Sequence, residues 1–403
     1  MITEEILEGI MRLLLTMNLP YEPAFGGASK ANRAVLELLA QRGHSISVVA
    51  PSFIPPPSGK YLTGDFNQRY EVQSFEDVTI SEINRVEVHS VDISRIPLRT
   101  YLAKYLAKFS GDCIMVSSED SMQVLLREAV SHAASPIVYL AHTPNCLPFG
   151  PASFFPSNSG SSLFHKVSAV IAVSQFCYNY IQRWGGVEPI QLYLPIYGQP
   201  PYPHFSNYRE GFITMINPCG YKGIDIFLQL SQAHPELQFA GVPSWGTTSN
   251  DLQRLHAQPN ITILDAHPNI DTILQRTRLI LVPSLYLENL PMIIIESMLR
   301  GIPVIASNVG GIPEAKLGTD YLLDVHPIER YLNTWDERKL WVPIVPAQDI
   351  APWDDALRSI LANEDAYGCA SENARQVSTA FAASLSLDPF EDFLESITAG
   401  GRR

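Results

Sequence analysis

A strand, a glycine turn, a helix and a second strand follow one another within the first 51 residues, and this order constrains the fold more than any other feature. Residues 11–17 form an apolar run and are followed by Gly26-Gly27. A helical pattern then ends at Gly43, and residues 45–50 form the second apolar run. Because a helix between two strands brings them into parallel alignment, this segment predicts a parallel sheet.

The same alternation continues along the chain. A helix is expected over residues 122–130, with Met122 on its apolar face. Further helices are expected to begin at Ile224 and at about Pro291, and another is expected near 390–397. Further strands are expected at 113–116, 137–140, 167–173, 213–216, 238–240, 261–264, 279–282 and 304–306.

A proline-rich stretch at 195–210 interrupts the alternation and predicts a linker. We therefore expect an N-terminal domain over 1–197, a linker over 198–209, a C-terminal domain over 210–375 and a helical tail over 376–403 that packs back towards the N-terminal domain. The fold class is α/β: two Rossmann-like, doubly wound parallel-sheet domains facing across a cleft, with ligands at the carboxyl ends of the strands.

Charge and apolar content exclude several classes of protein. The 403 residues carry a formal charge of −13, so binding to nucleic acid is not expected. The apolar runs are shorter than the ~20 residues of a spanning helix, which predicts no integral membrane contact. The five cysteines are scattered, as in a reduced cytoplasmic protein.

Two carboxylates around a predicted helix start are the most informative local pattern. Glu288 precedes the helix expected from Pro291, and Glu296 lies in its second turn. Eight helical rises span about 12 Å, roughly the length of a nucleotide-sugar from ribose to hexose. The helix N-terminus between them suits a diphosphate, and the carboxylates suit sugar hydroxyls. The alternative interpretation is a capping residue and a solvated helix face.

Four further features fit either a ligand site or ordinary structure. Lys222 at a helix start is either a partner for an anionic leaving group or a surface lysine. The pairs Gly26-Gly27 and Gly310-Gly311 either allow a close ligand approach or mark turns. His142 at a strand end is either a site residue or a structural histidine.

Metal-ligand patterns are absent from the sequence. It contains no DxD motif, and His165, Asp265 and His267 have no metal-ligand spacing. We therefore expect no metal and no cofactor. Aromatic residues after His142 are candidates for an acceptor pocket or for core packing: Phe149, Phe154 and Phe155.

Taken together, these motifs resemble those of the retaining glycosyltransferases of family 4, which have the GT-B fold. The most specific match is the E-x7-E signature, Glu288-Asn289-Leu290-Pro291 through Glu296, continued by Gly301-Ile302-Pro303 and Gly310-Gly311-Ile312-Pro313-Glu314. Weaker matches are Gly26-Gly27, Arg42-Gly43-His44, His142, Ala172-Val173-Ser174 and Lys222-Gly223.

The resemblance implies transfer of a sugar from a nucleotide-diphosphate sugar to an acceptor hydroxyl with retention. A UDP-sugar is favoured over a GDP-sugar as the donor, although the sequence does not reveal the base. His142, Glu288 and Lys222 would serve catalysis, the lysine by neutralising the leaving diphosphate. Glu296 would bind ribose. The remaining donor contacts implied are Gly26, Gly27, Asn217, Leu290, Met292 and Ile293.

Two departures from the family pattern bear on the diphosphate site. Asn217 stands where the family usually has an arginine five residues before the lysine, and Pro291 has no N–H to donate. Two alternatives stay open: another GT-B enzyme, such as a nucleotide-sugar epimerase or a phosphorylase, or a non-catalytic nucleotide-sugar-binding protein. The acidic surface favours a soluble small-molecule or oligosaccharide acceptor over a lipid.

Overall fold

The computed structural model describes residues 9–24, 26–52, 72–74 and 77–400. The described residues before Tyr197, together with those from Leu385 onward, form one compact unit, and Tyr197–Ser384 form a second. We call these the N-terminal and C-terminal domains. The proline- and glycine-rich sequence over 51–70 predicts a long loop, and most of this stretch lies outside the described residues.

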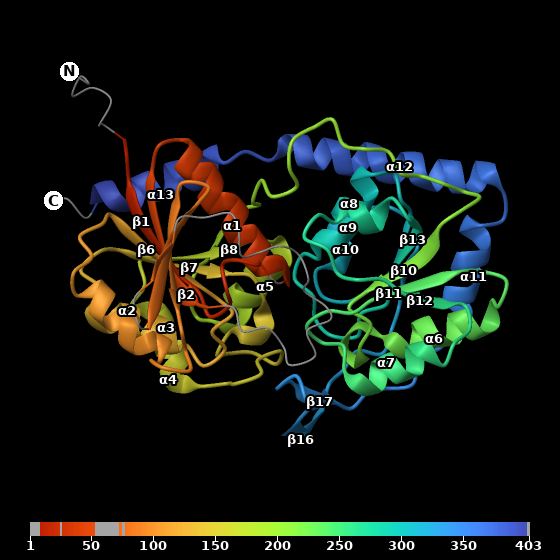
Figure 1. Ribbon diagram of the computed structural model, residues 1–403, viewed down its shortest axis with the longest axis horizontal. Helices are drawn as coiled ribbons and strands as arrows, with labels where there is room; N and C mark the ends of the chain where they lie inside the picture. The colour runs from red at the N-terminus through yellow and green to blue at the C-terminus, as the bar shows by residue number, and fades with distance from the viewer. Residues whose placement is uncertain (1–8, 25, 53–71, 75–76, 401–403) are drawn as a thin grey trace. The chain divides into compact units, whose positions relative to one another are not determined.

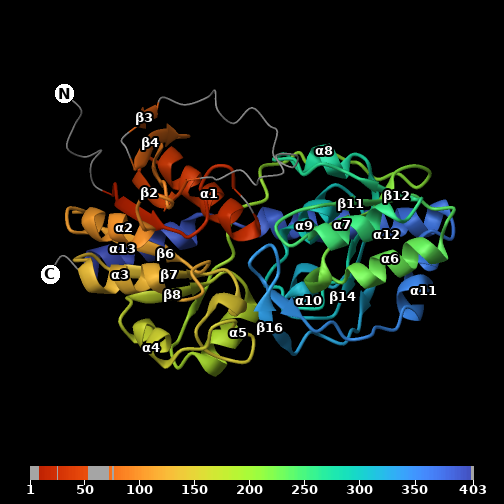
Figure 2. The ribbon, with the colours of Figure 1, turned by 60° about the horizontal axis from the view of Figure 1, so that its bottom comes forward.

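The sheet of the N-terminal domain has the strand order β3-β4-β5-β2-β1-β6-β7-β8-β9, which Figure 2 shows from β3 and β4 at one edge to β8. From β5 to β9 neighbouring strands are parallel, as the alternation predicted. Their bounds are Arg12–Thr16 (β1), Ser45–Pro51 (β2), Val72–Ser74 (β3), Val78–Ile83 (β4), Val86–Val91 (β5), Cys113–Ser117 (β6), Ile137–Ala141 (β7), Ala169–Ala172 (β8) and Ile190–Gln191 (β9).

Helices cover both faces of this sheet (Figure 1), because alternate residues of β1 point to opposite sides. Leu13 and Leu15 pack with α1 (Gly26–Gln41) and with α13 (Asp388–Gly400), whereas Leu14 packs with the other helices. Those are α2 (Leu98–Leu106), α3 (Val124–His132) and α5 (Gln175–Trp184); the short α4 spans Asn158–Ser161.

Two parts of the N-terminal domain differ from the sequence analysis. The antiparallel pair β4–β5 was not predicted, although Asn84 and Arg85, both at positive φ, form the tight turn that joins the strands. The placement of Met122 on a helix face is wrong. Helix α3 begins two residues later, and Met122 is 64% exposed.

The C-terminal domain has an all-parallel sheet of order β12-β11-β10-β13-β14-β15. The bounds are Phe212–Ile216 (β10), Phe239–Val242 (β11), Ile261–Ile263 (β12), Thr277–Val282 (β13), Val304–Ser307 (β14) and Leu322–Leu323 (β15). A separate antiparallel hairpin consists of β16 (Tyr331–Trp335) and β17 (Trp341–Pro343), and the sequence analysis missed it.

Helices of the C-terminal domain pack on the sheet and on one another, with α12 against α9 and α11 against α6. Their bounds are Ile224–Ala233 (α6), Ser249–His256 (α7), Asp271–Leu274 (α8), Met292–Leu299 (α9), Ile312–Ala315 (α10), Ala351–Ile360 (α11) and Glu364–Ser384 (α12). None of the helices in the described ranges is both long and apolar enough to cross a membrane.

The five cysteines are all thiols. Cys113, Cys177 and Cys219 are buried, Cys146 is partly buried and Cys369 is exposed.

Candidate active site

Glu288 is the centre of a polar cluster in the C-terminal domain. Its Oε1 accepts hydrogen bonds from the Ser284 hydroxyl, at 2.7 Å, and from Lys222 Nζ, while its Oε2 accepts from the Tyr286 hydroxyl at 3.1 Å. Glu288 is 6% exposed. A buried carboxylate needs such partners, and the lysine supplies the opposite charge.

The Gly310-Gly311 pair holds the main chain of Glu288. Gly310 has a φ of +60°, and a Cβ there would lie 2.5 Å from the Glu288 carbonyl oxygen. The Gly311 N–H donates to that same oxygen at 2.8 Å. The close approach that the glycines permit is therefore to the backbone of Glu288, so they position this carboxylate.

Lys222 ends the 3₁₀ turn η4 (Gly220–Lys222), and the next residue fixes its place. Gly223 has a φ of +78°, and a Cβ there would lie 2.0 Å from the carbonyl oxygen of Pro283, just after β13. Lys222 Nζ also lies 5.1 Å from the Tyr286 ring centre and 5.9 Å from that of Trp245. The predicted surface-lysine alternative is therefore wrong, because the ammonium is held by an acid and aromatic faces.

Helix α9 begins between Glu288 and Glu296. We expected Pro291 to be the first residue of this helix. It is the N-cap instead, because a ψ of 109° keeps it outside the helix. No side chain caps this end. The amides of Met292 and Ile293 thus open the helix, where a dipole favours negative charge. Glu296 lies in the second turn and is partly buried.

Asn217 follows β10 in a left-handed conformation, with a φ of +57°. Its amide oxygen accepts from the Gly246 N–H at 2.9 Å and from the Thr247 hydroxyl at 3.2 Å. Its Nδ2 is buried without a hydrogen-bond partner among the described residues. Asn217 therefore holds the loop that carries Trp245 and leaves one donor unused.

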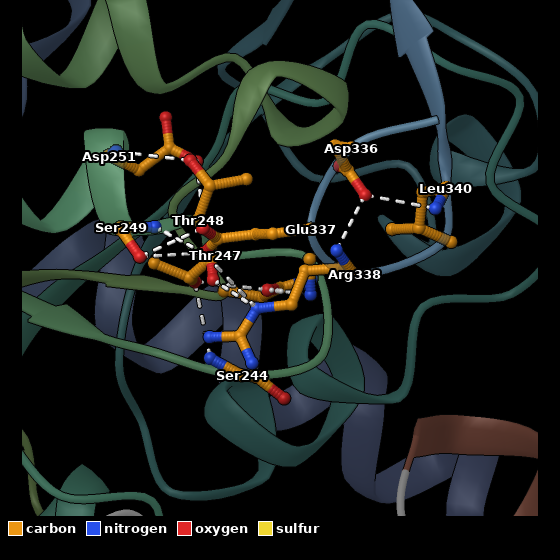
Figure 3. Close-up of polar contacts among 11 residues, drawn as sticks. Ser244, Thr247, Thr248, Ser249, Asp251, Asp336, Glu337, Arg338 and Leu340 are labelled. Atoms are coloured by element: carbon orange, nitrogen blue, oxygen red, sulfur yellow. Dashed lines mark hydrogen bonds and ion pairs between the residues drawn. The ribbon is translucent and has the colours of Figure 1, made fainter. Parts of the chain in front are cut away.

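The β16–β17 hairpin is tied to the same loop (Figure 3). Arg338 Nε donates to the Thr247 carbonyl at 2.8 Å, and Glu337 accepts from the N–H and the hydroxyl of Ser249 at the start of α7. At the start of β17, the Trp341 carbonyl accepts from the hydroxyl of Tyr221, the neighbour of Lys222. The hairpin thus braces both loops that flank the Lys222 ammonium.

The N-terminal domain has its own polar group at the carboxyl ends of β6 and β7. His142 Nε2 contacts Asn32 Oδ1 at 2.7 Å, and Asn32 Nδ2 donates to the Ser117 hydroxyl oxygen at 2.7 Å. The Ser117 hydroxyl then donates to Glu119 Oε2. Asn32 lies on α1, whose first turn contains the predicted Gly26 and Gly27.

Burial changes the acid–base properties of this group. It lowers the pKa of His142 to about 4, so the imidazole is neutral at pH 7. Burial also raises the pKa of Glu119 to about 7, although the hydrogen bond from Ser117 opposes the shift. Glu119 Oε1 has no hydrogen-bond partner within the described chain.

The other predicted candidates are less informative. Phe149 is 7% exposed and its ring lies 5.1 Å from that of Phe164, so it belongs to the core; Phe154 and Phe155 are partly buried. In the ranges that the structure describes, no group of three or more metal-ligating side chains forms a candidate metal site.

Two family models match the sequence, one to each domain. The model described as glycosyltransferase family 4 matches residues 25–193, and the model described as glycosyl transferases group 1 matches residues 211–330. The chain is a family 4 type glycosyltransferase. The β16–β17 hairpin of this glycosyltransferase begins just after the second match ends. A search of curated proteins finds no match.

Solved GT-B structures are similar to this glycosyltransferase along nearly its whole length. The sucrose-phosphate synthase of Thermosynechococcus elongatus is 15% identical, with a TM-score of 0.66 over 92% of this chain and 94% of that one. Anabaena HepE in complex with UDP and glucose is 15% identical, with a TM-score of 0.64 over 96% and 99%. The catalytic domain of Arabidopsis thaliana starch synthase IV, bound to ADP and acarbose, is 11% identical, with a TM-score of 0.62 over 98% and 99%.

Sequence reasoning missed the partners of the predicted residues. Ser284 and Tyr286 lie only four and two residues before Glu288, so their spacing was a usable signal. Asn32, Ser117 and Glu119 gave no such signal, because 85 residues separate Asn32 from Ser117.

Proposed function

We propose that this glycosyltransferase moves a hexosyl group from a nucleotide-diphosphate sugar to an acceptor hydroxyl with retention and without a metal. We favour a UDP-sugar over a GDP-sugar as the donor. The observation that carries the proposal is the Lys222–Glu288 pair at the start of α9. It combines a cation and an open helix N-terminus for the diphosphate with a carboxylate for sugar hydroxyls.

Glu288 suits hydroxyl binding better than nucleophilic attack. Both of its oxygens already accept hydrogen bonds, from Ser284, Tyr286 and Lys222. These donors stabilise its charge and lower its nucleophilicity. This favours a mechanism in which the acceptor approaches from the face that the diphosphate leaves, while Lys222 and the α9 amides stabilise the developing negative charge.

The remaining roles follow the family resemblance. Glu296 binds the ribose hydroxyls, Asn217, Leu290, Met292 and Ile293 line the donor, and the first turn of α1 at Gly26-Gly27 approaches the diphosphate. His142 binds the transferred sugar through a neutral imidazole, which its lowered pKa favours. We propose a soluble small-molecule or oligosaccharide acceptor and a cytoplasmic location.

The test is a panel of UDP-, GDP- and ADP-sugars with mixed acceptors, in which released nucleoside diphosphate is measured with and without EDTA. We expect release with a UDP-sugar, unchanged by EDTA, and an α-linked product from an α-linked donor by NMR. An epimerised donor without release, or tight donor binding without turnover on any acceptor, would contradict the proposal. A β-linked product from that donor would rule out retention.

A further inference from the structure

A continuous chain of hydrogen bonds leads from His142 to Glu119 inside the N-terminal domain. It crosses three elements: His142 follows β7, Asn32 lies on α1, and Ser117 ends β6. Asn32 is 1% exposed and Ser117 is fully buried, so water does not compete for these bonds.

The direction of every hydrogen bond in this chain follows from the bond at its end, between Ser117 and Glu119. Ionised Glu119 can only accept, so the Ser117 hydroxyl donates to it. The Ser117 oxygen then accepts from Asn32 Nδ2, which turns the amide oxygen towards the ring, and His142 Nε2 must carry the hydrogen. The other ring nitrogen, Nδ1, is thereby the acceptor of the imidazole.

We propose that Glu119 is a positioning residue, which holds His142 in the Nε2–H tautomer through Ser117 and Asn32. The role of the histidine in sugar binding rests on the proposed function, whereas its tautomer does not. A protonated Glu119 reverses the chain. It donates to Ser117, the serine donates to a rotated Asn32 amide oxygen, and the amide NH₂ donates to Nε2, which leaves the hydrogen on Nδ1.

The pKa of Glu119, raised by burial to about 7, allows this reversal near neutral pH. The ionisable groups that interact with Glu119 are Asp120 on the same segment, Tyr139 on β7 and Cys146 on the 3₁₀ turn η2 (Pro144–Cys146). Burial raises the pKa of Cys146 to about 12 and that of Tyr139 well above 10, so both stay protonated. The nearby Asp120 carboxylate adds to the rise in the pKa of Glu119, which burial dominates.

The direct test is the tautomer of His142, read from ¹⁵N–¹H spectra of the full chain labelled at histidine and assigned with His142→Gln. We expect Nε2–H at pH 8.5 and a shift towards Nδ1–H as the pH falls from 8 to 6. In Ser117→Ala and Glu119→Gln this shift should vanish. Glu82→Gln, on an exposed position of β4, is the control that keeps it.

The kinetic test uses the same variants. We expect Glu119→Gln to lower kcat about tenfold with little change in donor KM, and to remove the loss of kcat/KM that wild type shows as the pH falls through 7. The inference is overturned if His142 keeps one tautomer in wild type and both variants, or if wild type already holds Nδ1–H at pH 8.5. A wild type that transfers no sugar contradicts the proposed function, while the spectra still decide the inference.

Discussion

The two domains differ in how they accommodate the buried polar groups near the carboxyl ends of their strands. In the C-terminal domain Glu288 has a donor on each oxygen and a cation beside it. In the N-terminal domain the Thr16 and Ser29 hydroxyls and Glu119 Oε1 are buried without hydrogen-bond partners in the described parts of the chain. The hydrogen bonds to the Glu288 carboxylate are complete before a ligand arrives, whereas the polar groups of the N-terminal domain gain from one.

This contrast indicates which substitutions should affect stability and function separately. Substitutions in the polar cluster around Glu288 remove satisfied hydrogen bonds, so they should lower both stability and activity. Changes that remove an unsatisfied group of the N-terminal domain should stabilise the fold while they damage substrate binding.

Glu288→Ala should lower the free energy of unfolding by about 4 kcal/mol, because it leaves the Lys222 ammonium partly buried without its acid. We also expect kcat to fall at least 100-fold. Thermal melts and initial rates measure the two effects, with Glu210→Ala on an exposed position as the control. Full activity in Glu288→Ala would remove the cluster from the mechanism.

Glu119→Gln should stabilise the protein at high pH. The pKa of Glu119 is raised from 4.5 to about 7, so this carboxyl favours folding below pH 4.5 and loses that contribution as the pH rises through 7. The variant should therefore gain about 3 kcal/mol over wild type at pH 8.5 and nothing at pH 4.5. An equal difference at both pH values in denaturant titrations would show that the carboxyl is not destabilised by burial.

Glu296→Ala should weaken nucleotide binding about tenfold to 100-fold, as the loss of a charge-assisted hydrogen bond does. Turnover at saturating donor should change less than in Glu288→Ala. Calorimetry with UDP separates the two variants. If both lose the same small amount of affinity and turnover, the assigned roles are wrong.

Thr16→Val should raise the free energy of unfolding by about 1 kcal/mol, because a methyl group replaces a fully buried hydroxyl without a partner. We expect a higher acceptor KM in the same variant. A loss of stability would mean that the hydroxyl is already hydrogen-bonded in the free protein.

Arg338→Ala should have the smallest effect, a rise of about threefold in donor KM, since it removes one bond from the hairpin to the Thr247 carbonyl at a half-exposed position. Arg330→Ala, an exposed arginine just before β16, should leave KM unchanged. Equal values for the two variants would show that the hairpin does not brace the donor loops.

Much of the fold could be predicted because strands and helices leave local periodic patterns. The predicted strands from Arg12–Thr16 to Val304–Ser307 all form, and α9 begins one residue after the expected Pro291. The pair β4–β5 and the β16–β17 hairpin were missed, since both lie outside the strand–helix alternation on which the prediction relied.

The candidate site divides in the same way. Glu288, Lys222 and the glycines were found because they belong to short motifs. The chain from Asn32 through Ser117 to Glu119 was missed, because it is made by elements that meet only in the folded domain. Their hydrogen bonds depend on the register of β6 and on the rotation of α1, which no local spacing records.

The last helix has a consequence for the order in which the protein can fold. Leu387, just before α13, and Phe390 and Leu394 on it complete the apolar core beneath α1 and β1, although hundreds of residues separate them from those elements in the sequence. On a ribosome, the N-terminal domain therefore cannot close its core until α13 has been synthesised. The C-terminal domain, Tyr197–Ser384, is synthesised before α13, so it can fold before the N-terminal domain is complete.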